Sequence, residues 1–214
     1  GDMFVGAMLD LGLPLSTLKA ELKKIPTLRY TLTVSKKTVH SIRATRFHVV
    51  CPNRESARSW KQIRTLISGS GLRPKVKETG LDIFSRLAEA EGKIHGVAPE
   101  KVHFHEVGAT DSIVDIIAAA IGAHELAIDA FHFSRIPLGR GLTRALHGPL
   151  PIPGPATLEL LKGIPVQGID LDSETVTPTG AAIVRTLAKG FGAQPSMTIE
   201  KIGYGAGQKN FPNR

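Results

Sequence analysis

Two histidines and three acids lie close together in the segment VHFHEVGATDSIVD, residues 102–115. Side chains alternate between the two faces of a β-strand, so a strand over 102–107 would place His103 and His105 on the same face. Paired imidazoles are a common start of a site for Zn²⁺, Cu²⁺ or Ni²⁺. We therefore predict a metal site whose ligands come from His103, His105, Glu106, Asp111, Asp115 and, from a later loop, His147.

The same residues also have plainer interpretations. Strand histidines can bind carbonyl groups at the end of a sheet, and Asp111 can satisfy free N–H groups in the first turn of the next helix. Asp115 is harder to explain in this way, because the sequence around it, IVDIIAAAIGA, is apolar on every side. Such a helix is buried, and a buried carboxylate needs a hydrogen-bonding or cationic partner, or it takes up a proton. His40, His48 and His95 accompany basic residues and are not assigned to the site.

Other groups suggest phosphate or cation binding. Arg140 and Arg144 lie in a glycine- and proline-rich stretch, and arginine pairs with phosphate through two hydrogen bonds. Asp170, Asp172 and Glu174 alternate and could hold a hard cation, although such a run is more often a solvated edge. The glycines of GYGAGQ could approach a phosphate, but no helix follows them, so they do not match a dinucleotide-binding loop.

The spacing of apolar residues predicts short strands interleaved with helices. A hairpin over 28–50 should turn near Lys36 and Lys37, and further strands are expected over 102–107, 130–138 and 197–204. Helices are expected over 4–9, 17–24, 53–67, 74–94, 111–127, 155–163 and 178–190, with Ser16 and Asn53 as caps of the second and third. The fold class is therefore mixed α/β (α+β), with one compact domain over 1–214 that comprises a basic subregion, 1–77, and a histidine-motif core, 78–214.

Composition excludes several classes of protein. With 42% hydrophobic and 21% charged residues among 214, the chain is neither disordered nor fibrous. Its longest apolar run, 116–123, is too short to span a membrane. A single cysteine, Cys51, rules out an internal disulfide and fits a reducing compartment. We expect a soluble protein of the cytoplasm.

The net charge of +8 is concentrated in one block. Fifteen of the 27 lysines and arginines lie within 19–77, where the only acids are Glu21 and Glu55. Such a block attracts nucleic acid, a phosphorylated small molecule or an acidic surface. Nucleic acid is the less favoured partner, because proteins that bind single strands need aromatic side chains for stacking, and the block holds only three. A solvated basic face without a specific ligand is the simplest alternative.

Six long motifs follow one another along the chain: GDMFVGAMLDLGL, FSRLAEAEGKIHG, KVHFHEVGATDSIVDIIAAAIG, HGPLPIPGPATLELLKG, ETVTPTGAAI and GYGAGQKNFPNR. In this order they resemble the nickel insertion proteins of nickel-pincer cofactor biosynthesis, the LarC family, over essentially the whole chain. The resemblance implies a CTP-dependent nickel chelatase (a lyase and cyclometallase). Such a protein inserts Ni²⁺ into a pyridinium bis-thiocarboxylate mononucleotide and so makes the cofactor of lactate racemase-type enzymes.

The resemblance also implies ligands and limits. In this setting the predicted metal ligands would hold or relay Ni²⁺, and Arg140 and Arg144 would steer the phosphorylated pyridinium substrate. The family's first strand and its C-terminal domain, which is associated with nucleotide binding, have no counterpart in 1–214, so we expect an N-terminal portion of a longer protein. Docking to that C-terminal domain and homo-oligomer formation are left open, and no catalytic residue is assigned.

Two other functions fit parts of the sequence. A metal-dependent hydrolase can begin its site with a His-x-His pair, although barrels of that kind need about 250 residues, most of them after the pair. A binding module for nucleic acid or for an acidic protein would use the basic block without any chemistry and would lose its ligand steeply with added salt.

Overall fold

The computed structural model describes residues 1–52, 58–104, 107–145 and 148–209. Its helices are α1 (Asp2–Asp10), α2 (Leu15–Leu22), α3 (Trp60–Ser68), α4 (Pro74–His95), a 3-10 turn η1 (Pro99–Lys101), α5 (Thr110–Glu125), α6 (Pro155–Leu160) and α7 (Pro178–Leu187). Its strands are β1 (Thr31–Val39), β2 (Ile42–Val50), β3 (Phe131–Phe133), β4 (Ile136–Leu138), β5 (Leu142–Ala145), β6 (Gly148–Pro151), β7 (Val166–Gly168), β8 (Ala188–Phe191) and β9 (Gly205–Ala206). The predicted mixed class of short strands and helices is confirmed.

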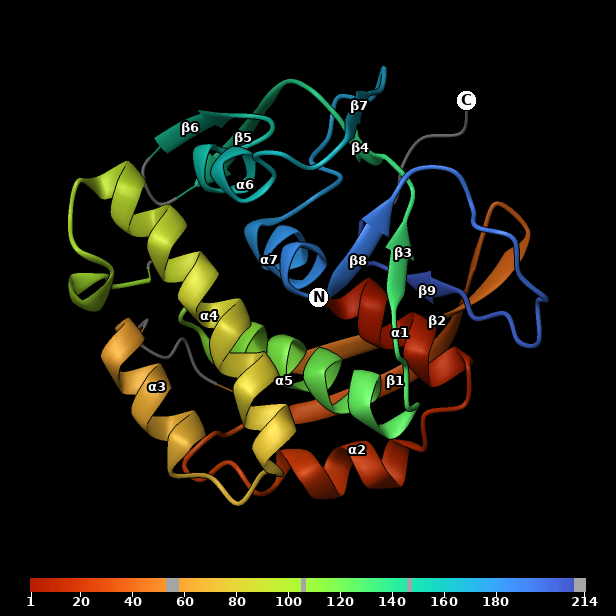
Figure 1. Cartoon of the computed structure of the whole chain (residues 1–214), viewed down its shortest axis with the longest axis horizontal. Coiled ribbons are helices and arrows are strands. Elements are labelled where there is room, and N and C mark those ends of the chain that lie inside the picture. Colours follow the sequence, from red (N-terminus) through yellow and green to blue (C-terminus); the bar gives the residue numbers. More distant parts are fainter. Residues whose placement is uncertain (53–57, 105–106, 146–147, 210–214) are drawn as a thin grey trace.

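Helix α5 runs through the centre of the molecule (Figure 1). Helices α1, α2, α4 and α7 contact it, and the hairpin β1–β2 lies behind it in this view. Its isoleucines have no exposed surface: Ile113, Ile116, Ile117 and Ile121. A helix that is apolar on all sides is stable only when it is enclosed, so the prediction of a buried helix around Asp115 is confirmed.

The sheet of β1, β2 and β9 shows one error in the predicted hairpin. β1 and β2 pair antiparallel from Thr31 with Val50 to Val39 with Ile42, and the turn is His40-Ser41 rather than the predicted Lys36-Lys37. Both turn residues have positive φ, 46° and 66°, the conformation whose twist matches that of paired strands. Lys36 therefore lies within β1, and β9 adds to the other side of β2 in parallel.

Three further two-stranded sheets complete the fold: β3 with β8, β4 with β7, and β5 with β6. The predicted single strand over 130–138 is divided, because β3 and β4 pair with different partners. In place of the predicted strand at 102–107, the described residues show only an isolated bridge between Ser59 and His103. The predicted strand at 197–204 forms no ladder, and β9 begins after it.

The helix boundaries depend on local caps. Ser59 caps α3 through a capping box with Gln62, and the predicted cap Asn53 lies outside the described residues. Ser16 is not a cap, because α2 already begins at Leu15 after Pro14. α7 begins after Thr177 as predicted but ends at Leu187, where the chain passes directly into β8.

One continuous hydrophobic core joins these elements. It includes the predicted inner stripe of α3, Trp60, Ile63 and Ile67, and buried residues of α1, α2, β2, α4, α5 and α7. No helix in the described ranges is long and apolar enough to cross a membrane.

Candidate functional site

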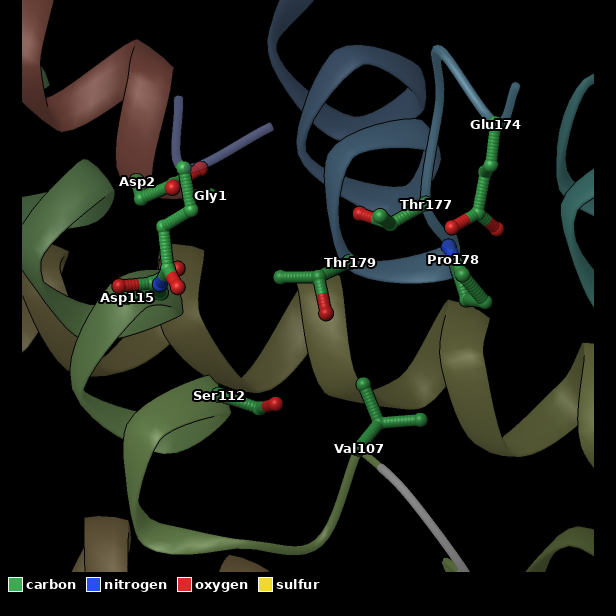
Figure 2. Close-up of a pocket in the computed structure, with 10 residues that line it drawn as sticks. Gly1, Asp2, Val107, Ser112, Asp115, Glu174, Thr177, Pro178 and Thr179 are labelled. Atoms are coloured by element: carbon green, nitrogen blue, oxygen red, sulfur yellow. The ribbon is translucent and has the colours of Figure 1, made fainter. Parts of the chain in front are cut away.

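A pocket of about 280 Å³ lies where the starts of three helices meet (Figure 2). The first residue of α1 contributes Asp2, the first turns of α5 contribute Ser112 and Asp115, and the start of α7 contributes Thr177 and Thr179. The other lining residues are Gly1, Val107, Glu174, Pro178 and Gln208. The pocket therefore joins segments from both ends and the middle of the chain.

Helix periodicity explains why α5 presents a carboxylate here. Ser112 and Asp115 are three residues apart, so both side chains lie on the face of α5 that meets the start of α1. The backbone of Asp2 forms a hydrogen bond with the Asp115 carboxylate. A Cβ atom at Gly1 would collide with that carboxylate, so glycine permits the close approach. The hydrogen-bonding partner expected for Asp115 is thus the beginning of another helix.

Burial is the main influence on Asp115. It raises the pKa of this carboxyl group to about 7. The hydrogen bond from the Asp2 backbone favours the charged form, whereas the nearby carboxylates of Asp2 and Asp111 disfavour it. Asp115 consequently holds its proton up to about neutral pH, far above the range of an exposed aspartate.

Gln208 and Lys209, which follow β9, form hydrogen bonds at the other wall of the pocket. Lys209 donates hydrogen bonds to the backbone oxygen of Glu174 (3.2 Å) and to its carboxylate (3.3 Å). The side-chain amide of Gln208 donates to Nδ1 of His48 on β2 (2.8 Å). His48, which is not one of the predicted metal ligands, thus contacts a residue of the pocket lining.

The predicted metal ligands are only partly described. His103 is exposed between buried Val102 and Phe104, which confirms the alternation for these three residues, and it does not line the pocket. Asp111 is an exposed first-turn acid whose Oδ1 accepts a hydrogen bond from the Ser112 backbone (2.8 Å). The remaining predicted ligands besides Asp115 lie outside the described residues: His105, Glu106 and His147. In the part of the chain that the structure describes, no three His, Cys, Asp or Glu residues form a group able to hold a metal ion.

The whole chain, residues 1–214, matches the family model described as nickel insertion protein. The chain belongs to this family. A Citrifermentans bemidjiense protein named for nickel insertion is 50% identical over 213 residues, which is 99% of this chain and 55% of that protein. A Desulfitobacterium hafniense protein named pyridinium-3,5-bisthiocarboxylic acid mononucleotide nickel insertion protein is 45% identical over 210 residues, 98% of this chain and 52% of the relative. The chain spans about half the length of these curated relatives, and no solved structure matches it.

Arg140, one of the two predicted phosphate-binding arginines, does not line the pocket. Arg140 forms ion pairs with Asp170 (2.5 Å) and Asp172 (2.9 Å), and all three side chains are well exposed. The alternating acids that could have held a cation are thus paired with an arginine or, for Glu174, with a lysine. Nothing is described of the Arg144 side chain.

The glycines of the GYGAGQ motif serve packing. A Cβ atom at Gly205 would overlap the backbone oxygen of Met3, because β9 lies directly against α1. Only glycine allows this approach. The motif that resembled a phosphate-binding loop therefore joins the last strand to the first helix.

Sequence reasoning missed most of the pocket lining. Asp115 was selected because an acid within an apolar helix is conspicuous. Asp2 and Thr179 carry no comparable signal, whereas Glu174 belongs to the alternating acidic run and the Thr177-Pro178 pair indicates the start of a helix.

Proposed function

We propose that this chain takes part in nickel insertion into a pyridinium-3,5-bisthiocarboxylic acid mononucleotide, the process named in its Desulfitobacterium relatives. The observation that supports this most strongly is the family match over residues 1–214. In the whole protein the reaction is a CTP-dependent nickel chelatase step of the lyase class, carried out in the cytoplasm. Ni²⁺ is its substrate, and the product is the nickel-pincer cofactor of lactate racemase-type enzymes.

The histidine motif is the proposed point of nickel entry. His103 offers an exposed imidazole two residues before His105, and Glu106 is followed by Val107, which lines the pocket. The motif thus leads along the sequence into the pocket wall and on to Asp111 and Asp115. A protein that passes its metal on needs exchangeable coordination, because sulfur and carbon atoms of the substrate must replace protein ligands.

The basic block supplies the attraction for the phosphorylated substrate. It includes α2, the hairpin β1–β2 and α3, whose lysines and arginines have few acidic neighbours in the sequence. A surface of one charge sign raises the local concentration of an oppositely charged ligand. Arg140 already has two carboxylate partners, so its share in steering is expected to be small.

Nickel binding by the isolated chain tests the histidine assignment. The double variant His103→Ala/His105→Ala should bind Ni²⁺ at least about tenfold more weakly than the unchanged chain in equilibrium dialysis, because imidazole is the principal donor for this metal. His95→Ala/His132→Ala removes two other exposed histidines and is the matched control. Equal affinity of the two double variants would remove the histidine motif from the nickel site.

Nickel transfer by the longer protein tests the function itself. A full-length relative that carries the histidine substitutions should transfer less radioactive nickel to the thiocarboxylate mononucleotide in the presence of CTP. Absence of nickel transfer by the unchanged full-length protein, with retained metal-dependent hydrolysis, would favour the hydrolase alternative.

A further inference from the structure

The pocket places two kinds of group opposite one another. Asp2 and Asp115 lie on one side, and the first turn of α7, with Thr177 and Thr179, lies on the other (Figure 2). Carboxylates favour a cation, whereas the N–H groups at the start of a helix favour an anion. Neither type of ion alone suits both walls, so the lining points to a ligand that contains both charges.

Thr179 provides an independent sign of a missing ligand. Only 8% of its surface is exposed, and its side chain points into the pocket. Its hydroxyl has no hydrogen-bond partner among the described residues. The hydroxyl oxygen is accessible from the pocket and not enclosed by protein atoms, so it is available there to water, an ion or a ligand.

The backbone of the same turn points to an acceptor as well. Pro178 has no N–H group, and the N–H of Gly180 is already bound by the Thr177 hydroxyl (3.2 Å). The first N–H groups of a helix lack partners within the helix, which leaves the N–H of Thr179 as a donor at this end of α7. Hydroxyl and N–H of one residue can together bind a phosphate oxygen.

The charge at this wall is more favourable to an anion than the lining suggests. Glu174 is neutralised by Lys209, whose ammonium group lies 3.3 Å from the carboxylate. Among the described residues, the lining carboxyl groups without a cationic side-chain partner are therefore those of Asp2 and Asp115, on the other wall. This separation of carboxylates from anion-binding groups is the arrangement expected around a cation that bridges protein and phosphate.

We propose that the pocket binds a phosphate group together with Mg²⁺: Asp2 and Asp115 hold the cation, and Thr179 with the start of α7 holds the phosphate. Mg²⁺ in proteins commonly has one or two carboxylate ligands and completes its shell with phosphate oxygens and water. The lining has oxygen donors and one amide but no imidazole or thiolate, so it suits Mg²⁺ better than Ni²⁺.

The volume of the pocket limits the size of the ligand that it can bind. About 280 Å³ accommodates a phosphate with its cation, while the remainder of a nucleotide would extend beyond the pocket. The phosphate is either that of the pyridinium mononucleotide or that of a nucleoside triphosphate. Assignment to the mononucleotide rests on the proposed function, whereas joint binding of magnesium and phosphate does not depend on nickel.

Isothermal titration of the chain tests the proposal with two probes, nicotinic acid mononucleotide and CTP, each with and without MgCl₂. At least one probe should bind about tenfold more tightly with Mg²⁺ present. Tighter binding of the mononucleotide would assign the pocket to the substrate, and tighter binding of CTP would assign it to the nucleotide. Equal affinity with and without Mg²⁺ for both probes would overturn the proposal.

Two substitutions on one helix locate the binding. Thr179→Val should weaken the Mg²⁺-dependent affinity about tenfold, because it removes the hydroxyl donor. Thr186→Val on the same helix is the matched control, since it makes the same substitution at a hydroxyl that lies outside the pocket lining. Equal affinities of the two variants, with thermal midpoints within about 2 °C of each other, would place the ligand elsewhere.

The carboxylate wall is tested separately. Asp115→Asn should abolish the gain in affinity from Mg²⁺, because an amide is a poor replacement for a carboxylate ligand. Retention of the full Mg²⁺ effect would contradict the proposal. Loss of nickel binding in the histidine variant, with the Mg²⁺ effect intact, would show that the two sites act independently.

Discussion

The aspartates at the two ends of helix α1 lie in contrasting surroundings. At its last residue, Asp10 accepts hydrogen bonds from the Thr45 hydroxyl (2.6 Å) and the Tyr204 backbone (2.9 Å) and forms an ion pair with Lys36. At its first residue, Asp2 lies beside the buried Asp115, and no side-chain cation is paired with Asp115 among the described residues. One end is fully satisfied and the other faces a cavity.

The pKa shifts of the two groups follow from these surroundings. Lys36, Thr45 and the Tyr204 backbone hold the pKa of Asp10 well below its usual range, because each stabilises the charged carboxylate. Burial raises the pKa of Asp115 to about 7, because the carboxylate has lost water without gaining a full set of donors. The stabilising carboxylate of Asp10 on α1 can thus be distinguished from the buried carboxyl group of Asp115 on α5, which faces the pocket.

The largest expected effect is the pH dependence due to Asp115. The folded chain binds its proton more tightly than the unfolded chain, whose aspartates have a pKa near 3.8, so stability falls as pH rises from about 4 to about 7. Asp115→Asn removes this penalty. Between pH 4 and pH 8, the difference in stability between the variant and the unchanged chain, both without metal, should therefore shift in favour of the variant by on the order of 3 kcal/mol. Urea unfolding at several pH values measures the difference.

The exposed acid Asp129 supplies the control for that measurement. Asp129→Asn should give a pH profile parallel to that of the unchanged chain. If Asp115→Asn were also parallel, the pKa of Asp115 would be the same in the folded and unfolded chain, and burial would not distinguish Asp115 from an exposed acid.

A smaller loss of stability is expected at the satisfied end. Asp10→Ala leaves the Tyr204 N–H and the buried Thr45 hydroxyl without their acceptor and should destabilise the fold by about 2 kcal/mol at neutral pH. Urea unfolding can compare it with Asp82→Ala, which removes an exposed ion pair with Arg86 and should change stability by less than about 0.5 kcal/mol. Equal losses in the two variants would mean that the cluster around Asp10 is no stronger than a surface pair.

The smallest effect on stability is expected for ion pairs at the surface. Arg140→Ala breaks pairs whose partners are both well exposed, so the urea midpoint should not change measurably. A clear shift of the midpoint would show that these exposed ion pairs stabilise the fold, as the Asp10 cluster does. Stopped-flow binding of the phosphorylated substrate would in addition reveal any slower association, which should disappear at high salt.

The elements that sequence reasoning located well are those with a repeating local pattern. α4 and α5 lie close to the predicted ranges, because apolar residues three and four apart define a helix without reference to other segments. The prediction of a strand over 197–204 was wrong, because an extended segment forms a ladder only beside a partner strand. Its last backbone N–H is bound instead by Asp10, 194 residues away in the sequence.

The candidate site shows the same division. An acid within an apolar helix is visible in any sequence, so Asp115 was singled out, whereas the neighbours that give it a role could not be. Asp2 and Thr179 are ordinary helix-start residues until the fold brings them together, and the contact between Gln208 and His48 spans 160 residues.

The sequence by itself determined the mixed class, the buried central helix and membership of a family, because periodicity, burial and ordered motifs are properties of the chain alone. Only the tertiary structure decided which helix starts meet and which carboxylates keep a partner. The reason is physical: turns and caps depend on residues a few positions apart, whereas the desolvation and pairing of a charge depend on every segment that packs around it.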